Sequence, residues 1–227
     1  MGNGVAEGCI RVAVDAVVFT VMHDELKVLL ITRNRPPFKG KLALPGGFVE
    51  ENEGLEYAVK RELTEETSVK DIFLRQIGAY GNVKRDPRGR VMSIAFLALI
   101  RPDQELASTA DALGAEWRSV DDLGNLAFDH KQIIEDALKE LRFDIQTTNI
   151  AVQILPKRFT LTELQYLYEL VLKKPFDKRN FRRRMKELGV LKEFSETKMG
   201  GAHRPAQLYG FKDSEYLPLK DRLQVFT

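Results

Sequence analysis

The chain has 227 residues, of which 44% are hydrophobic and 30% are charged, a composition typical of folded globular proteins and unlike that of disordered chains. Because domains cluster near about 100 to 150 residues, we expect two domains. The longest apolar run, 12–22, is far shorter than the ~20 residues of a membrane-spanning helix, and a single cysteine excludes an internal disulfide. We therefore expect a cytoplasmic protein without a membrane partner.

The net charge of +2 hides an uneven distribution along the chain. Residues 151–227 contain 16 Lys and Arg against 9 Asp and Glu, a net charge of +7, whereas residues 1–150 contain 19 against 24, a net charge of −5. A basic segment favours an anionic partner, most commonly nucleic acid, and an acidic segment suits a cation site. The two parts therefore predict different functions.

The first part has the pattern of an α/β sandwich with a mixed sheet. Apolar and β-branched runs predict strands, and apolar residues spaced by three and four predict amphipathic helices. Because the helices are interspersed with the strands without strict alternation, we expect a layered α/β fold. The expected strands cover 12–21, 27–32, 72–80 and 91–100, the first two forming a hairpin, and the expected helices cover 55–66 and 130–141.

The periodic pattern weakens over 143–156, and we place the linker there. This predicts an α/β domain at 1–147 and a second domain at 148–227.

Two helices and a hairpin are expected in the second domain. Thr160 or Thr162 can cap a helix that reaches about Leu172. Asp177 then caps a helix of about twelve residues that ends at Gly189. Short strands at 190–194 and 207–211 follow and predict a β wing.

Three glutamates at a helical spacing are the main chemical feature of the first domain. They lie at positions 62, 65 and 66 in the segment GFVEENEGLEYAVKRELTEETSV, which spans 47–69. Offsets of three and four bring the carboxylates to one helix face, where they repel one another unless a divalent cation neutralises them. Mg²⁺ is the expected ion because it prefers hard oxygen ligands, and Mn²⁺ stays open. Such an ion polarises a bridging phosphate and lowers the pKa of an attacking water.

The same segment resembles the signature of Nudix hydrolases. Gly47 is followed after five residues by Glu53 and after seven more by Arg-Glu-Leu, any residue and Glu-Glu. A solvated Glu-rich helix, the alternative, does not account for five polar residues at fixed offsets. Ser68 replaces the usual glycine, which leaves the geometry of the following turn open. The resemblance implies catalytic roles for Arg61, Glu62, Glu65 and Glu66, with the three glutamates as metal ligands and Arg61 orienting Glu62 through a salt bridge.

Basic loops flank this segment at 33–40 and 85–90. The second loop, together with the strand after it, resembles the ADP-ribose pyrophosphatase branch of the Nudix family, which implies ADP-ribose as the ligand. Ordinary exposed basic loops remain the alternative, because charge clusters alone rarely encode a partner. His130 begins a helix, and we expect a structural role for it. The expected ligand-binding residues are Arg33, Arg35, Lys39, Gly46, Gly47, Arg85, Arg88 and Arg90.

The helix after Asp177 has one apolar and one basic side. At 100° per residue Phe181, Met185 and Leu188 form a narrow stripe, and the cations lie opposite. Such a helix can enter the major groove of DNA, so we predict a winged helix-turn-helix, with a solvated basic face on an accessory domain as the alternative. The expected DNA-binding residues are Lys178, Arg179, Asn180, Arg182, Arg183, Lys186, His203 and Arg204.

Nearly the whole chain resembles the Nudix-related transcriptional regulators of bacteria. The resemblance rests on the acidic segment followed by FTLTELQ, DKRNFRRR and RPAQLY. It implies a regulator that senses ADP-ribose or a related nucleotide, acts in NAD metabolism and binds double-stranded operator DNA as a homodimer. The intact glutamates keep an alternative open, in which the protein is a Mg²⁺-dependent ADP-ribose pyrophosphatase yielding AMP and ribose 5-phosphate.

Overall fold

The computed structural model describes residues 9–67, 72–101, 114–199, 205–213 and 215–219. The chain divides into two compact units. The described part of the first unit consists of residues 9–19, 27–67, 72–99 and 114–137. The described part of the second consists of residues 20–26, 100–101, 138–199, 205–213 and 215–219. Within the described ranges, no helix is long and apolar enough to cross a membrane.

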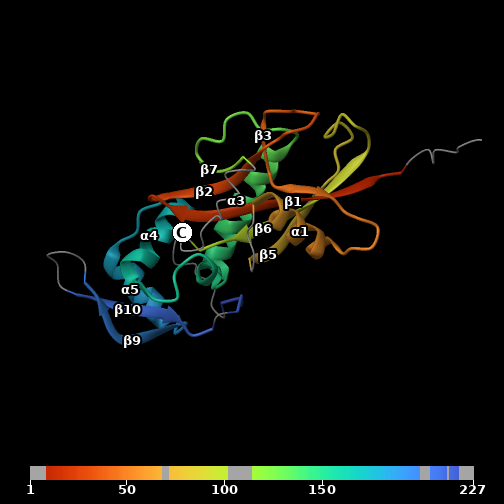
Figure 1. The fold of residues 1–227 in the computed structure, drawn as a ribbon. Helices are drawn as coiled ribbons and strands as arrows, with labels where there is room; N and C mark the ends of the chain where they lie inside the picture. Colours follow the sequence, from red (N-terminus) through yellow and green to blue (C-terminus); the bar gives the residue numbers. More distant parts are fainter. Residues whose placement is uncertain (1–8, 68–71, 102–113, 200–204, 214, 220–227) are drawn as a thin grey trace, which may run out of the picture. The chain divides into compact units, whose positions relative to one another are not determined.

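A seven-stranded mixed sheet is the centre of the first unit (Figure 1). Five strands follow the order β3-β2-β1-β6-β5, while β4 pairs with β1 and β7 pairs with β2. The central pair β1 and β6 is parallel, and β5 runs antiparallel to β6, which confirms the predicted mixed sheet. The strands are β1 (Arg11–Met22), β2 (Glu25–Thr32), β3 (Leu42–Ala43), β4 (Gly46–Phe48), β5 (Phe73–Tyr80), β6 (Val91–Leu99) and β7 (Ala115–Ser119).

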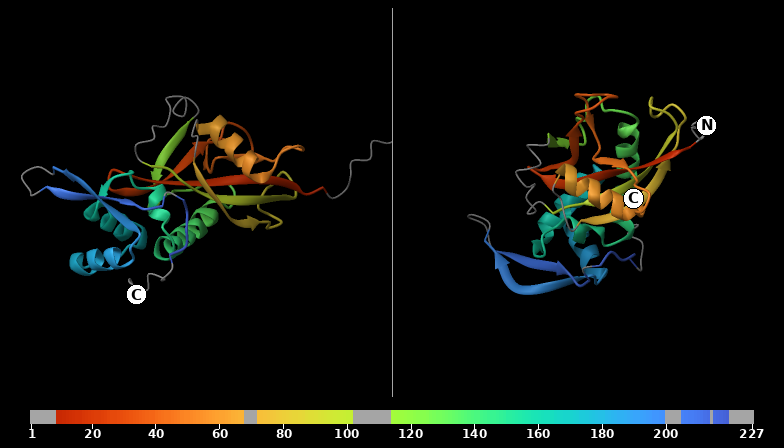
Figure 2. Two further views of the ribbon diagram at one scale, coloured as in Figure 1. Left: turned by 90° about the horizontal axis from the view of Figure 1, so that it is seen from below. Right: turned by 45° about the vertical axis from the view of Figure 1, so that its right-hand side comes forward.

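Two helices cover this sheet, α1 (Leu55–Thr67) and α3 (His130–Thr147). The left view of Figure 2 shows them on opposite faces of the sheet, which gives the expected α/β/α sandwich. Val59 and Leu63 of α1 are fully buried, as are Ile133 and Ala137 of α3. The apolar stripes that the sequence predicts therefore pack against the sheet.

The chain after residue 141 differs from the expected linker. The helix α3 continues to Thr147, and the short 3-10 helix η1 (Ile150–Gln153) follows. Ile145 is fully buried one turn after Leu141, so the buried face of α3 extends beyond the end of the helix expected at 130–141. The expectation of a linker starting at 143 is wrong for this reason.

After α3 and η1, the described residues of the second unit form two further helices and a three-stranded antiparallel sheet in the order β8-β10-β9. The hairpin of β9 and β10 forms the wing, drawn in blue in Figure 2. This arrangement confirms the predicted winged helix. The elements are β8 (Phe159–Thr160), α4 (Leu161–Leu172), α5 (Lys178–Glu187), β9 (Leu191–Lys198) and β10 (Ala206–Phe211).

Side-chain caps define where both helices begin. Thr160, one of the two expected caps, accepts the N–H of Glu163, whose carboxylate accepts the N–H of Thr160 in return, a capping box. Asp177 caps α5 as predicted, accepting the N–H of Asn180 at 2.9 Å. The helices then pack through Tyr168 and Phe181, whose ring centroids lie 5.4 Å apart.

Candidate functional site

Arg61 ties the acidic face of α1 to the loop before the helix. Its guanidinium donates to both carboxylate oxygens of Glu53, at 2.6 and 3.0 Å, and to the carbonyl of Phe48 at 3.2 Å. It also donates to Glu62 at 2.8 Å, the salt bridge that the Nudix resemblance implies. The hydrogen bonds from Arg61 hold the pKa of Glu53 below its usual range, so Glu53 stays charged and fixes Arg61.

The two glycines before α1 allow close approach of the glutamates. A Cβ on Gly47 would lie 2.1 Å from Oε1 of Glu62, so glycine leaves the room that this carboxylate occupies. Gly46 has a φ of +153°, and a Cβ there would lie 2.1 Å from the carbonyl oxygen of Val14. Its backbone N–H donates to Oε2 of Glu66 at 2.8 Å. The loop and helix therefore position two carboxylates together.

Burial disfavours the charged form of two of the three glutamates. It raises the pKa of Glu66 to about 7, with the negative charges of Glu62 and Asp15 adding to the effect and the Gly46 N–H opposing it. Burial also raises the pKa of Glu62, although the Arg61 salt bridge opposes it. A cation beside these groups would favour their charged forms. The side chain of Glu65 is 60% exposed.

Glu62, Glu65 and Glu66 line one cavity of about 460 Å³. Among the residues that the structure describes, no three His, Cys, Asp or Glu side chains form a ready metal site. The donor chemistry still fits a hard divalent cation, because three carboxylates line one cavity and a positive charge there would favour the ionised form of Glu66. Cations suited to phosphate, from Arg33, Arg35 and Arg88, line the same cavity.

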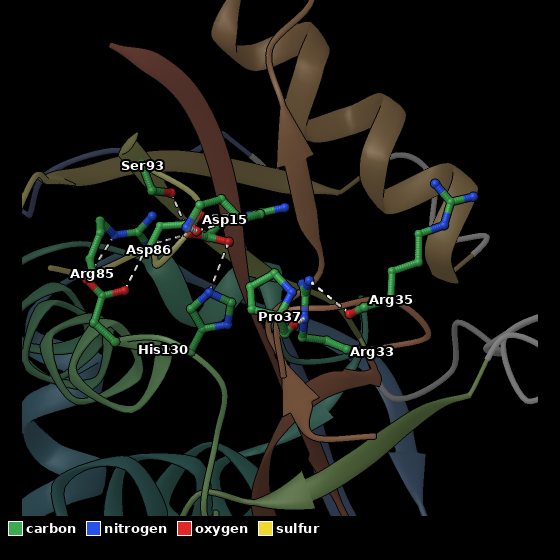
Figure 3. Close-up of polar contacts among 10 residues, drawn as sticks. Asp15, Arg33, Arg35, Pro37, Arg85, Asp86, Ser93 and His130 are labelled. Atoms are coloured by element: carbon green, nitrogen blue, oxygen red, sulfur yellow. Dashed lines mark hydrogen bonds and ion pairs between the residues drawn. The ribbon is translucent and has the colours of Figure 1, made fainter. Parts of the chain in front are cut away.

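A second cavity, of about 100 Å³, also contains Arg33 and Arg88 in its lining. Asp15, one of its two buried acids, is placed by β1 between three polar groups (Figure 3). Ser93 donates to Oδ2 of Asp15, Nη2 of Arg85 lies 3.4 Å from the same oxygen, and Nε2 of His130 lies 3.5 Å from Oδ1. Side chains from three other parts of the unit therefore hold Asp15 in the lining of the smaller cavity.

His130 joins this network to the glycine loop. Its Nδ1 accepts the backbone N–H of Leu44 at 2.8 Å, so the ring proton lies on Nε2, facing Asp15. Burial lowers the pKa of His130, with Arg85 in support and Asp15 opposed. A neutral, buried His130 that fixes a backbone N–H agrees with the structural role expected for it.

Arg85 and Arg88 lie on the same loop but have different surroundings. Arg85 is buried and donates to both oxygens of Asp129, at 2.7 and 3.0 Å. Arg88 donates to both oxygens of Asp86, at 2.7 and 3.0 Å. These hydrogen bonds outweigh burial and hold the pKa of Asp86 below its usual range. Arg85 is therefore a buried residue of the smaller cavity alone, whereas Arg88, with a side chain that is 37% exposed, lines both cavities.

Two arginines of the cavity linings, Arg33 and Arg88, lie over aromatic rings. The guanidinium of Arg88 lies 5.0 Å from the ring centroid of Phe48 and 5.6 Å from that of Phe128. The guanidinium of Arg33 also lies over the ring of Phe128, 4.8 Å from its centroid. Burial, and then the charge of Arg88, lower the pKa of Arg33, which indicates that an anion would be favourable here.

Six of the eight expected ligand-binding residues line one or both of these cavities. Arg33 and Arg88 line both cavities, and Arg35 lines the larger one. Gly46, Gly47 and Arg85 line the smaller one, whereas Lys39 and Arg90 are exposed and line neither. Ser68 lies outside the described residues. The sequence reasoning missed Asp15, Phe48, Asp86, Ser93 and Phe128.

The basic helix α5 presents its cations in two directions. Arg179, Asn180 and Arg183 are exposed, whereas Lys178 and Arg182 line a cavity together with Lys198 of the wing. Lys186 lies 5.9 Å from the ring centroid of Tyr209. Phe181 and Met185 are buried, as the apolar stripe predicts. The two remaining expected DNA contacts, His203 and Arg204, lie outside the described residues.

Two family models match separate parts of the chain. The NUDIX domain matches residues 10–138, and the NrtR DNA-binding winged helix domain matches residues 151–211. An ADPR responsive transcriptional repressor NtrR from Acinetobacter baylyi is 38% identical over 89% of this chain and 82% of its own length. The ADP-ribose pyrophosphatase of Methanocaldococcus jannaschii is 44% identical over 56% of this chain and 73% of its own.

Solved structures give the same division. NrtR from Shewanella oneidensis in complex with a 27mer DNA aligns with a TM-score of 0.81 and 36% identity, covering 88% of this chain and 93% of that one. The NUDIX domain of the same protein with ADP ribose aligns with a TM-score of 0.54 and 36% identity, covering 62% and 94%. Members of the Nudix pyrophosphatase family use divalent metal ions in hydrolysis.

Proposed function

We propose that this chain is a transcriptional regulator whose Nudix domain binds ADP-ribose, because it belongs to the NrtR family of Nudix proteins with a C-terminal winged helix. The observation that carries the proposal is the presence, in one chain, of a cavity lined by acidic and basic residues and a winged helix with a basic α5. A plain hydrolase has no use for the second feature.

The ligand site that we propose uses the two cavities that share Arg33 and Arg88. The planar guanidinium group of arginine can donate two hydrogen bonds to the oxygens of a pyrophosphate. Three such groups line the larger cavity, those of Arg33, Arg35 and Arg88. Arg85 would act indirectly, because it is buried and Asp129 and Asp15 hold its guanidinium, whereas Arg88, although paired with Asp86, is 37% exposed. We assign pyrophosphate contact to the first three arginines and positioning to Arg85.

The metal that we propose is Mg²⁺, with Mn²⁺ as a substitute, held by Glu62, Glu65 and Glu66. A bound divalent ion would bridge to phosphate oxygens and lower the pKa of a nearby water. Arg61 fixes the position of Glu62, and the Gly46 N–H fixes that of Glu66. Glu65 is exposed and, among the described residues, contacts Arg61 at 3.6 Å, so its side chain could turn toward a bound ion.

The DNA contact that we propose is made by α5 in the major groove. The exposed Arg179, Asn180 and Arg183 can reach base edges, where Arg favours guanine and Asn favours adenine.

We further propose a cytoplasmic homodimer with a domain boundary between residues 147 and 148. Sedimentation of the full chain tests the dimer, and limited proteolysis tests the boundary.

Fluorescence anisotropy with duplexes from the upstream region of the protein's own gene tests the regulatory proposal. We expect binding that weakens steeply with salt and a change of operator affinity on addition of ADP-ribose. Arg183→Ala should relax sequence preference, whereas Arg118→Ala, an exposed cation of β7 paired with Glu116, should have no effect. Absence of duplex binding at any salt concentration would refute the proposal.

Hydrolysis of ADP-ribose to AMP and ribose 5-phosphate is a second candidate function. It is favoured by the three glutamates on one cavity and by the 44% identity to a pyrophosphatase. Purified protein with Mg²⁺ and ADP-ribose should release AMP, and Glu65→Gln should abolish the release without changing DNA affinity. If the wild type releases no AMP with either Mg²⁺ or Mn²⁺, the domain is a sensor only.

A further inference from the structure

A cavity of about 590 Å³ lies within the winged-helix unit, among residues of α4, α5 and the wing strands. Three cations from two elements line it, Lys178 and Arg182 of α5 and Lys198 of β9. Lys178 and Arg182 are four residues apart and thus share one face of their helix. Glu163 is the single carboxylate among the lining residues, so the cavity carries an excess of positive charge.

Arg182 has a donor that lacks a partner. Its Nη2 donates to the hydroxyl of Thr162 at 3.2 Å, which aims the guanidinium at the start of α4. Its Nε is buried and, among the described residues, has no hydrogen-bond partner. Buried guanidinium N–H groups are normally satisfied. An oxyanion that enters the cavity would supply the missing acceptor.

Lys198 has one anionic partner within the described residues. Its ammonium group lies 2.6 Å from Oε1 of Glu163, while Oε2 of Glu163 accepts the N–H of Thr160 at 2.7 Å in the capping box. Although burial raises the pKa of Glu163, the hydrogen bonds from Lys198 and Thr160 keep it below the usual range. The carboxylate is therefore charged and anchored to the helix cap, whereas the side chain of Lys198 is 59% exposed.

We propose that this cavity binds a backbone phosphate of DNA through Lys178, Arg182 and Lys198, and that Glu163 competes with that phosphate for Lys198. The inference rests on the proposed DNA-binding function and adds the contact that fixes the domain on the backbone. Phosphate contacts set position and affinity, and base contacts set sequence preference. The cavity cations Lys178 and Arg182 lie about 100° around the helix from the exposed Arg179 and Arg183, so the two tasks fall to neighbouring strips of the basic side of α5.

The salt dependence of binding distinguishes this site from a general basic surface. Each neutralised phosphate contributes about 0.9 to the slope of log K against log salt. Lys198→Gln should lower that slope by about this amount and weaken binding to operator and scrambled duplexes by the same factor. Lys192→Gln is the matched control, because Lys192 lies on the same strand, over the Phe194 ring and outside the cavity lining.

Glu163→Gln tests the competition directly. Glutamine preserves the capping box but removes the charge that competes for Lys198, so both duplexes should bind several-fold more tightly at low salt. Thermal melting of each variant shows whether it is folded. Lys178→Gln is a second cavity variant, which tests the loss of the phosphate contact independently of Lys198.

Two results would overturn the inference. The first is a wild-type salt slope in both Lys198→Gln and Lys178→Gln, and the second is unchanged affinity in Glu163→Gln. If the wild type binds no duplex at all, the proposed function fails instead.

Discussion

The backbone N–H of Gly46 donates a hydrogen bond of 2.8 Å to the carboxylate of Glu66, twenty residues later in the chain. This contact joins the glycine loop to the acidic face of α1. The same loop leaves room at Gly47 for the carboxylate of Glu62. Because both glutamates depend on the backbone conformation of the loop, changes in the loop should alter metal binding without removing a ligand.

Gly47→Ala should reduce affinity for Mn²⁺ at least tenfold. The added Cβ would lie 2.1 Å from Oε1 of Glu62, so the carboxylate must move away from the position that we assign to it. Titration of Mn²⁺ by calorimetry or by electron paramagnetic resonance measures the change. Gly54→Ala is the control, because nothing lies within 4 Å of a Cβ at Gly54. Equal affinities in the two variants would contradict the assignment of Glu62 as a ligand.

Arg61→Lys should weaken ligand and metal binding while the fold persists. Lysine keeps the charge but cannot donate to Glu53, Glu62 and the Phe48 carbonyl together, as the guanidinium does. We expect at least a tenfold loss in ADP-ribose affinity measured with Mg²⁺, and an unchanged circular dichroism spectrum. Lys60→Arg, at the preceding exposed position of α1, should leave affinity unaltered. A wild-type affinity in Arg61→Lys would show that Glu62 needs no such support.

His130 should make the stability of the first unit fall in acid. Burial lowers its pKa in the folded state, so below about pH 6.5 the unfolded chain takes up a proton that the folded chain does not. The free energy of unfolding contributed by this group is therefore highest above pH 6.5. It declines as the pH falls from there to the folded pKa, by at most about 1.4 kcal/mol per pH unit.

His130→Asn removes this titration and keeps an acceptor for the Leu44 N–H. Urea unfolding between pH 5.5 and 8 should show a smaller loss of stability in acid for the variant than for the wild type. The control is His23→Asn, because His23 is exposed and its φ of 51° suits asparagine. Parallel pH curves for His130→Asn and the wild type would show that His130 does not titrate as described.

Phe181→Ala should destabilise the winged-helix unit by about 3 to 5 kcal/mol, the usual cost of removing a fully buried phenylalanine. Phe181 is 1% exposed and contacts the rings of Tyr168 and Phe176. Chemical unfolding followed by fluorescence measures the loss. Phe143→Ala, at a side chain that is 56% exposed, should change stability by less than about 0.5 kcal/mol. Similar losses in the two variants would place Phe181 outside the core.

The elements with strong periodic or capping signals could be predicted from the sequence. The helix expected at 55–66 is α1, Leu55–Thr67, and the cap at Asp177 is observed. The strands β3, β4, β7 and β8 were missed because they have two to five residues, too few for a period to show. Their pairing depends on partners far away in the sequence, which local patterns do not record.

The site was predictable where a motif fixes spacing and unpredictable where distant strands meet. The glutamates of α1 follow from their offsets, but the contacts of Asp15 with Ser93 and His130 join three elements. One signal was present, since Asp15 is a lone acid in the apolar run 12–22 and a buried charge requires partners. Arg85 and Arg88 look equivalent in sequence, and only the structure shows that Asp129 holds the first.

Reciprocal titration of operator DNA and ADP-ribose on one preparation tests the central claim most directly. If the protein is an ADP-ribose-responsive regulator, saturating ADP-ribose should change the Kd for operator DNA by about 5- to 150-fold, and saturating DNA should change the Kd for ADP-ribose by the same factor. Tight binding of both ligands with each Kd unaffected by the other would contradict the account.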